Sequence, residues 1–230
     1  MPRTKIIILG ALVGLALTAA VAFAVDRTGT PGPDTIAGTA GADRINGLGG
    51  DDSLVGLGGA DQIDGGSDDD TIIGDNACPT GSSYYCIPAG TDGGDTLAGG
   101  SGQDVMRGNG GNDRVSGQGG DDRISGDTGN DRLSGGSGLD VVDGNSGNDH
   151  VTGSGGDDRL EGGAGNDKIS GGSGRDIIEG EAGNDRILAR DRARDRIRCG
   201  KGRDTVQADR IDKIARRGSQ RCEKISFPKR

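Results

Sequence analysis

The stretch GGSGLDVVDGNSGNDHVTGSGGDDRLEG, residues 135–162, places glycine or aspartate at nearly every second position and holds very few apolar residues. Of the 230 residues in the chain, 49 are glycine, only 30% are apolar and 2% are aromatic. Such a composition is typical of disordered chains, unless a repeat lets each unit bury its one apolar residue against a copy of itself. The period of the sequence therefore decides the fold.

The sequence repeats every nine residues. Sixteen units run from Gly29 to Ile73 and, after an interruption, from Gly90 to Leu188. Counted from the first residue of a unit, position 1 is always glycine, position 4 is glycine in all but one unit, position 6 is always aspartate and position 8 is always apolar. Glycine indicates positive φ or close backbone contact, and a lone apolar residue indicates the inward middle of a short strand. Each unit is therefore predicted to be a six-residue turn, ending at the aspartate, and a three-residue strand.

This spacing is that of the GGxGxDxUx nonapeptide, and the chain closely resembles the haemolysin-type (RTX) calcium-binding repeat proteins. Position 2 departs from that pattern, being glycine in only five units. The resemblance implies an all-β fold, a right-handed parallel β-roll or β-helix solenoid in which two units make one lap. It also implies Ca²⁺ ions between consecutive turns of one edge, held by turn carbonyls and by the position-6 aspartates Asp34, Asp43, Asp52, Asp61, Asp70, Asp95, Asp104, Asp113, Asp122, Asp131, Asp140, Asp149, Asp158, Asp167, Asp176 and Asp185.

An eighteen-residue pattern in the sequence agrees with a lap of two units. Asparagine recurs at position 5 of every second unit, at Asn112, Asn130, Asn148, Asn166 and Asn184. At position 7 the same units predict a basic column on one sheet, made of Arg114, Arg132, His150, Lys168 and Arg186. The units between them predict a mixed column on the other sheet, made of Val105, Arg123, Val141, Arg159 and Ile177.

The charge of the chain is divided. Residues 29–185 hold 29 acidic and 8 basic residues, whereas residues 186–230 hold 16 basic and 6 acidic residues. One buried apolar side chain per unit recovers less free energy than ordering nine residues costs. Calcium should supply the difference and neutralise carboxylates that would otherwise repel one another. We therefore expect an expanded chain without calcium and a rigid rod with it, folded after export into a calcium-rich medium.

Residues 1–24 are predicted to be a secretory signal peptide. Arg3 and Lys5 precede an apolar run, and Ala22-Phe23-Ala24 supplies a cleavage site. The apolar run is also about long enough to span a bilayer, so an uncleaved anchor is the alternative. Cleavage would leave an extracellular protein, secreted or associated with the cell wall, with no membrane span.

Four cysteines in an exported chain are expected to form two disulfides, since no metal-binding spacing accompanies them. Cys78 and Cys86 lie in an insertion, residues 75–89 of the repeat domain 25–188, where one unit is replaced. Tyr84 and Tyr85 make this segment either a partner-contact loop or a tolerated insertion whose rings cover the adjacent sheet.

After Leu188 the repeat slips by one residue and degrades, although Asp195 and Asp204 still fall at position 6. Residues 189–230 are predicted to be a basic cap over the last open edge, cross-linked by Cys199 and Cys222, with pairing to the cysteines of the insertion as the less favoured alternative. The alternative is that this segment binds an anionic wall polymer, a lipid or nucleic acid. Interspersed aspartates and the lack of stacking aromatics favour the cap, and nucleic acid is not expected to be a partner.

The sequence predicts no enzymatic activity. The single histidine, His150, belongs to an outward-facing column, and the glycine-rich stretches continue into a strand where a dinucleotide site needs a helix. Adjacent acids such as Asp51 and Asp52, in what is predicted to be an exposed turn, are better explained by cation binding than by acid–base catalysis. Three functions stay open: a self-standing calcium-folded or calcium-sequestering protein, a calcium-dependent adhesion module that contacts a cell-surface or wall polymer, and a remnant of a larger toxin or enzyme.

Overall fold

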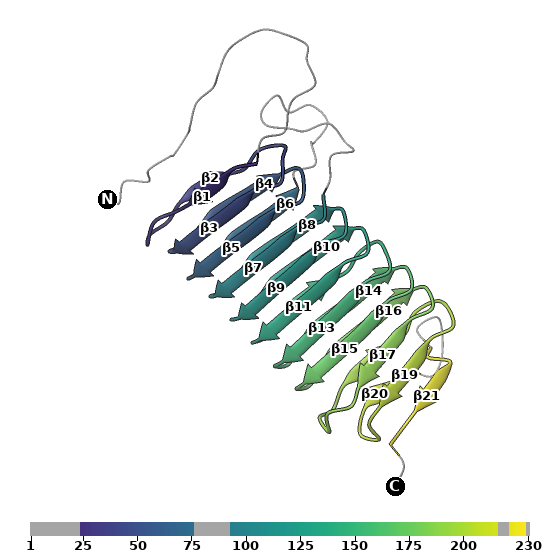
Figure 1. The fold of residues 1–230 in the computed structure, drawn as a ribbon. Helices are drawn as coiled ribbons and strands as arrows, with labels where there is room; N and C mark the ends of the chain where they lie inside the picture. Colours follow the sequence, from purple (N-terminus) through teal and green to yellow (C-terminus); the bar gives the residue numbers. More distant parts are fainter. Residues whose placement is uncertain (1–23, 76–92, 216–220, 229–230) are drawn as a thin grey trace, which may run out of the picture.

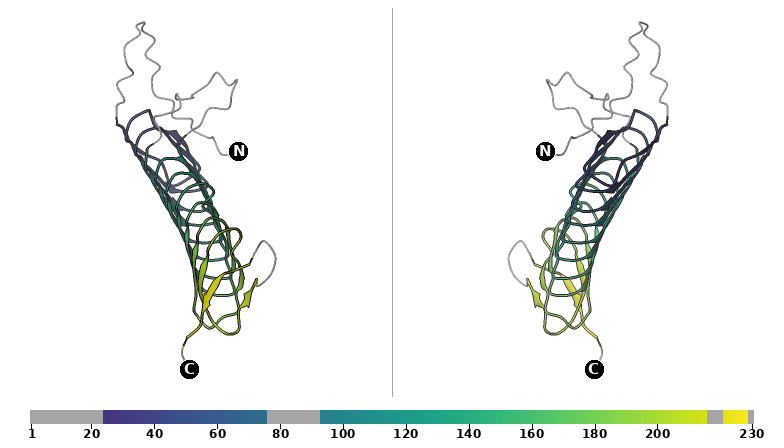
Figure 2. Two further views of the ribbon diagram at one scale, coloured as in Figure 1. Left: turned by 90° about the vertical axis from the view of Figure 1, so that its right-hand side faces the viewer. Right: turned by 90° about the vertical axis from the view of Figure 1, so that its left-hand side faces the viewer.

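The computed structural model describes residues 24–75, 93–215 and 221–228, and it is built from β-strands. The chain coils into a long rod in which two parallel sheets face each other (Figures 1 and 2). Consecutive strands alternate between the sheets, so that each lap contributes one strand to each. The predicted β-roll of two-unit laps is confirmed.

The odd sheet holds the eleven odd-numbered strands, in order along the rod. They are β1 (Asp26–Thr28), β3 (Arg44–Gly49), β5 (Gln62–Ser67), β7 (Thr96–Ser101), β9 (Arg114–Gly119), β11 (Arg132–Ser137), β13 (His150–Gly155), β15 (Lys168–Ser173), β17 (Arg186–Ala189), β19 (Thr205–Ala208) and β21 (Lys224–Ser226).

The even sheet holds the ten even-numbered strands. They are β2 (Thr35–Ala37), β4 (Ser53–Leu57), β6 (Thr71–Asp75), β8 (Val105–Gly110), β10 (Arg123–Thr128), β12 (Val141–Asp143), β14 (Arg159–Ala164), β16 (Ile177–Ala182), β18 (Arg196–Arg198) and β20 (Lys213–Ile214).

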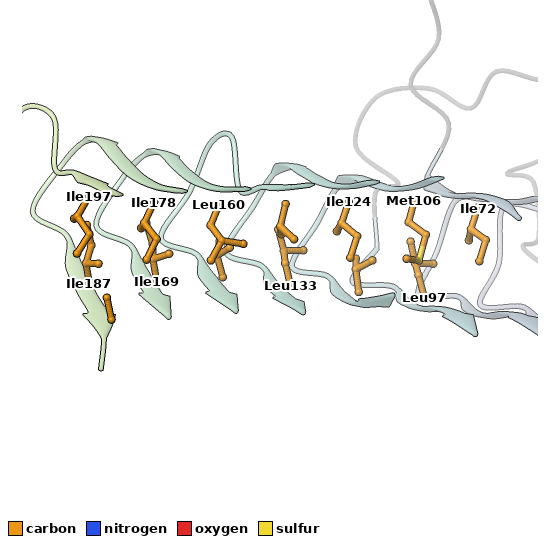
Figure 3. Close-up of a cluster of buried hydrophobic side chains, with 14 of the residues drawn as sticks. Ile72, Leu97, Met106, Ile124, Leu133, Leu160, Ile169, Ile178, Ile187 and Ile197 are labelled. Carbon is orange, nitrogen blue, oxygen red and sulfur yellow. The ribbon is translucent and has the colours of Figure 1, made fainter. Parts of the chain in front are cut away.

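The position-8 residues form the core as predicted. From Ile36 to Ile187 their side chains are at most 5% exposed. Figure 3 shows these side chains in two facing rows between the sheets, one row from each sheet. Each contributes about 1.5–3 kcal/mol by leaving water, and each contacts the equivalent residue of the next lap. The core is therefore only two side chains wide, and its stability depends on the stacking of the laps.

The strands are longer than the sequence predicts. In β11 the pairing with β9 includes Gly136↔Gln118 and Ser137↔Gly119, which lie beyond the predicted end of the strand at position 9. The ladder continues because the inward-facing glycine at position 1 keeps the alternation of buried and exposed residues. The predicted six-residue turn is therefore wrong for most units, and about three residues make the turn.

The interruption near residue 75 lengthens one lap and does not replace a unit. Gln62 pairs with Thr96 and Thr71 pairs with Val105, offsets of 34 residues where the other laps between Asp26 and Arg186 have 18. The strands on both sides keep their alternation between the sheets, which the loss of one unit would have broken. The predicted replacement is corrected to an insertion. Cys78, Cys86, Tyr84, Tyr85 and the signal peptide through residue 23 lie outside the described residues.

Candidate functional site

Two columns of buried aspartates follow the two edges of the rod, where the turns stack. Column A lies at the turns before the odd strands and comprises Asp43, Asp61, Asp95, Asp113, Asp131, Asp149, Asp167, Asp185 and Asp204. Column B lies at the turns before the even strands and comprises Asp34, Asp52, Asp70, Asp104, Asp122, Asp140, Asp158, Asp176 and Asp195. All of these residues are at most 5% exposed, so the expectation of exposed turn carboxylates is wrong for position 6.

One carboxylate oxygen of each aspartate holds two laps together. The backbone N–H of Asp122 donates to Oδ1 of Asp140 at 2.9 Å, and the N–H of Asp140 donates to Oδ1 of Asp158 at 3.0 Å. The same bond recurs along both columns at 2.7–3.0 Å. Each bond to a charged acceptor satisfies a buried donor. The invariant aspartate is therefore a structural residue as well as a candidate ligand.

The second oxygen, Oδ2, is buried and has no hydrogen-bond donor at most of the described turns. Donors are absent for Asp52, Asp61, Asp70, Asp95, Asp104, Asp122, Asp131, Asp140, Asp149, Asp158, Asp167, Asp176, Asp185, Asp195 and Asp204 within residues 24–75, 93–215 and 221–228. A buried carboxylate oxygen without a partner is strongly unfavourable, and a coordinated cation is one of the few groups that can compensate it.

The first two turns differ from the others. The N–H of Thr30 donates to Oδ2 of Asp34 at 2.5 Å, and its hydroxyl donates at 2.9 Å. Thr39 makes the equivalent bonds to Asp43. Position 2 is threonine in these turns, so that a protein donor occupies the oxygen that the other turns leave open. The sequence prediction of sixteen equivalent aspartates is therefore refined at Asp34 and Asp43.

The space around Oδ2 is lined by oxygen atoms. A Cβ added to Gly117, at position 1 of its unit, would lie 2.1 Å from Oδ2 of Asp122 and 2.5 Å from the carbonyl oxygen of Gly135. At position 4, Gly120 has φ +127°, and a Cβ there would lie 1.5 Å from the carbonyl oxygen of Gly102. Carboxylate and carbonyl oxygens are the ligands that Ca²⁺ takes. The donor set fits a Ca²⁺ ion between consecutive turns, and any side chain at position 1 would fill that space.

Electrostatics also favour a cation. Burial, together with the aspartates of neighbouring laps, raises the pKa of Asp104, Asp131, Asp140, Asp158 and Asp176 to about 6. The same effect raises the pKa of Asp61, Asp70, Asp149, Asp185 and Asp195 to about 7, and that of Asp95 to about 8. Without a counter-ion, the folded rod therefore disfavours the charged form of its own ladder.

Position 5 forms a second, exposed ladder. On the edge that carries column A, the backbone N–H of each asparagine donates to Oδ1 of the asparagine one lap earlier, at 2.7–3.0 Å. The series begins with Asn130 donating to Asn112 and ends with Asn184 donating to Asn166. On the edge that carries column B, the exposed Asp121 and Asp157 accept backbone N–H groups of the next lap at 2.8 Å. Adjacent acids such as Asp121 and Asp122 thus bond to separate groups, one outside and one inside the rod.

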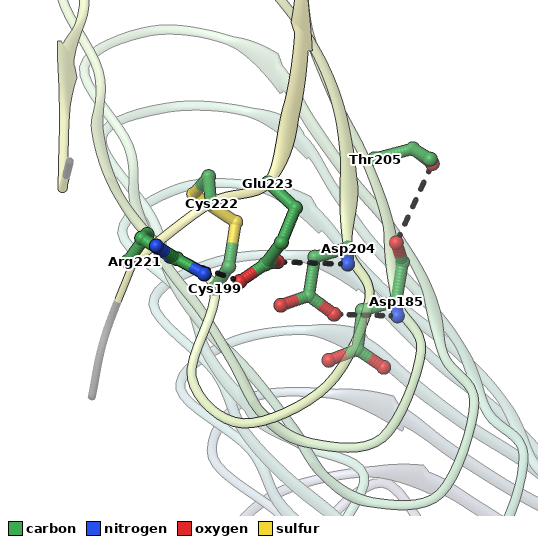
Figure 4. The surroundings of a disulfide bond; sticks show 7 residues. All are labelled: Asp185, Cys199, Asp204, Thr205, Arg221, Cys222 and Glu223. Carbon is green, nitrogen blue, oxygen red and sulfur yellow. Dashed lines mark hydrogen bonds and ion pairs between the residues drawn. A yellow bond between two sulfur atoms is a disulfide. The ribbon is translucent and has the colours of Figure 1, made fainter. Parts of the chain in front are cut away.

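Beyond Leu188, acids that the repeat spacing does not reveal continue both columns. Figure 4 shows the end of column A, at Asp185, Asp204 and Glu223. The N–H of Asp204 donates to Oε2 of Glu223 at 3.0 Å, and the N–H of Asp195 donates to Oδ1 of Asp212 at 3.1 Å. The predicted slip of one residue is confirmed, because Asp176 bonds to Asp195 across 19 residues. The predicted disulfide between Cys199 and Cys222 is also present, beside Glu223.

The predicted basic column is confirmed by the strand register. Arg114 pairs with Arg132, Arg132 with His150, His150 with Lys168, and Lys168 with Arg186 on the odd sheet. His150 is half-buried, and burial together with Lys168 and Arg132 lowers its pKa. No helix in the described part of the chain is long and apolar enough to cross a membrane.

Comparison with known protein families agrees with this geometry. The profile of the RTX calcium-binding nonapeptide repeat, a unit of four copies, matches residues 28–63, 47–76, 89–124, 116–151 and 152–187. A search of the curated proteins found no matching relative. The matches together span residues 28–76 and 89–187, which is more than half of the chain. The chain therefore belongs to the RTX calcium-binding nonapeptide repeat family, whose repeats bind calcium and fold as a β-roll.

Proposed function

We propose that this protein is an extracellular calcium-binding protein whose repeats fold into the rod when Ca²⁺ occupies the aspartate columns. The observation that carries the proposal is the buried Oδ2 without a donor at turn after turn. At several turns a backbone carbonyl oxygen borders the same space, as that of Gly135 does at Asp122. Repeats of this family are typical of secreted bacterial proteins, which supports the signal peptide at residues 1–24.

The proposed ligands are the position-6 aspartates, with two changes from the sequence prediction. Asp34 and Asp43 are the weakest candidates, because Thr30 and Thr39 already donate to their Oδ2 atoms. Asp195 and Asp204 join the set, since they repeat the buried geometry beyond the residues that the family profile matches. We also propose that the chain has no enzymatic activity of its own and that residues 189–230 serve as the cap of the repeat domain 25–188.

Calcium titration of the purified mature chain tests the proposal. Far-UV circular dichroism should show little β-structure in chelator and a cooperative gain on adding Ca²⁺, with several ions bound per chain by equilibrium dialysis. Mg²⁺ at the same concentration should be less effective, because it requires a smaller, octahedral site. A chain that keeps its full β-signal and a compact hydrodynamic radius in excess chelator would refute the proposal.

A second function, calcium-dependent adhesion, is favoured by the basic column on the odd sheet. Tyr84 and Tyr85 stay a predicted contact on the inserted loop, outside the described residues. Replacing both tyrosines by alanine and measuring calcium-dependent binding to cells tests that prediction, since unchanged binding would exclude the loop.

A further inference from the structure

The outer face of the odd sheet carries an uninterrupted line of basic side chains. The basic column, Arg114, Arg132, His150, Lys168 and Arg186, takes one residue from each of five adjacent strands in register. All of its members except the half-buried His150 are exposed. With strands about 4.8 Å apart, the column extends over roughly 19 Å.

Acidic residues are absent from the strands that carry this column. β9, β11, β13, β15 and β17 contain no aspartate or glutamate. Two positions further along four of the five strands, a row of hydroxyl groups runs beside the basic column, and on β17 this position is Leu188. The row is formed by Ser116, Ser134, Thr152 and Ser170. Within the described chain, Arg114, Arg132, Lys168 and Arg186 form no ion pair.

Two arginines of the even sheet have acidic partners. Arg159 pairs with Glu161 on the same strand, and Arg198 pairs with Glu179 on the neighbouring strand at 2.7 Å. Position 7 is basic on five successive strands of the odd sheet, whereas on the even sheet basic residues at this position alternate with Val141 and Ile177, and Arg159 there is ion-paired. Like charges directly opposite each other in a sheet are destabilising, so the basic column costs stability as it stands. A ligand that carries negative charge at a similar spacing would remove that cost.

Calcium connects this face to the aspartate columns. The basic column exists only when the laps are stacked, and its residues directly follow the column A aspartates in the sequence, as Arg132 follows Asp131. Bound Ca²⁺ would align the cations and also neutralise the carboxylates behind them.

We propose that this face of the odd sheet binds a linear anionic polysaccharide, an inference that rests on the calcium-dependent folding proposed above. Arginine forks match the sulfate or carboxylate groups of such a chain, and the serine and threonine row can exchange hydrogen bonds with sugar hydroxyls. Nucleic acid fits less well, because the five strands hold no phenylalanine, tyrosine or tryptophan on which bases could stack.

Two variants that carry the same net charge test the proposal. The first replaces four cations of the odd sheet by glutamine: Arg114→Gln, Arg132→Gln, Lys168→Gln and Arg186→Gln. The control replaces four exposed cations of the even sheet: Arg123→Gln, Arg159→Gln, Arg196→Gln and Lys213→Gln. Binding of calcium-loaded full chain to dextran sulfate is measured by titration calorimetry at several salt concentrations, with a single-stranded oligonucleotide as the competing polyanion.

We expect the odd-sheet variant to bind dextran sulfate at least about tenfold more weakly, with a shallower salt dependence, and the control to bind nearly as the natural chain does. Equal weakening of both variants, or tighter binding of the oligonucleotide, would overturn the proposal. The calcium-induced change in circular dichroism is followed in the same samples. If the calcium-induced change occurs but the natural chain does not bind dextran sulfate, only the proposed binding surface is rejected. If the calcium-induced change does not occur, the proposed function is rejected.

Discussion

Acidification should replace calcium in folding this chain. Burial raises the pKa of Asp140 from 3.8 to about 6 and that of Asp95 to about 8. A carboxyl whose pKa is higher in the folded state stabilises that state below its unfolded pKa, and the contribution is lost as the pH rises through the folded value. For the ladder aspartates, the stabilisation is therefore complete only below about pH 4, falls steadily as the pH rises, and is lost entirely between about pH 6 and 8.

The magnitude is large. For Asp140 the shift is roughly two units, and at 1.36 kcal/mol per unit the ionised carboxylate costs the folded state about 3 kcal/mol at neutral pH. Three such residues would cost about 9 kcal/mol, which already lies within the 5–15 kcal/mol that stabilises a typical domain. More than three aspartates have shifts of at least this size. The rod without calcium should therefore be unfolded at pH 7.5.

The assay compares calcium-stripped protein at pH 7.5 and pH 5.0 by far-UV circular dichroism and light scattering. The lower pH stays above the isoelectric point of about 4.6, which limits precipitation. Residual calcium is measured directly, because chelators weaken as the pH falls. We expect a partial gain of β-structure and a smaller hydrodynamic radius at pH 5.0, where about half of the cost at a residue such as Asp140 is relieved. A chain that stays expanded from pH 7.5 to 5.0 would show that repulsion and burial of the aspartates are not what calcium overcomes.

Three substitutions test separate parts of the site. Asp140→Asn keeps an acceptor for the ladder but removes the buried charge, so it should reduce the number of bound Ca²⁺ ions, measured by dialysis, whereas Asp34→Asn should change it little. Gly117→Ala should lower the melting temperature in calcium by several degrees, about 1–3 kcal/mol, because its Cβ would lie 2.1 Å from a carboxylate oxygen. Gly119→Ala, whose Cβ would meet nothing closer than 3.4 Å, is the control, and equal melting of the two would contradict the steric argument. Glu223→Gln should leave calcium folding intact but increase hydrogen exchange at the last lap by weakening a charge-assisted bond, and unchanged exchange would deny it a capping role.

The period of the sequence is sufficient to predict most of the fold. Aspartate at position 6 and an apolar residue at position 8 give the lap, the register and the core, and even the basic column around His150 follows from counting eighteen residues. Repeats permit this because each unit contacts only copies of itself. The prediction is wrong where the period breaks. From the sequence, the segment after Gly74 is interpreted as replacing one unit, but the strand pairing shows that the strands on both sides still alternate between the sheets.

The burial of the aspartates could not be predicted from pattern alone. Asp122 stands between a glycine-rich turn and an arginine, a setting that is typical of the surface, yet it is 1% exposed. What places it inside is the N–H of Asp104, which must find an acceptor one lap away once the turns stack. That requirement belongs to the stacked pair of laps and is visible in neither repeat alone. The distinction between Asp43 and its neighbours likewise depends on a position-2 threonine.

The ladder has a direction, and this accounts for the acids that follow the last repeat. Every buried N–H in the columns donates to the carboxylate of the following lap, so the first described residues need nothing added: the N–H of Val25 simply bonds to Asp43. At the C-terminal end, Asp195 and Asp204 have no following repeat, and their buried N–H groups would lose their acceptors. Asp212 and Glu223 supply them, and the disulfide at Cys222 fixes the chain next to Glu223. The disulfide therefore adds a covalent link beside the last acceptor of column A, whereas the other rungs of the ladder are held by noncovalent contacts between laps.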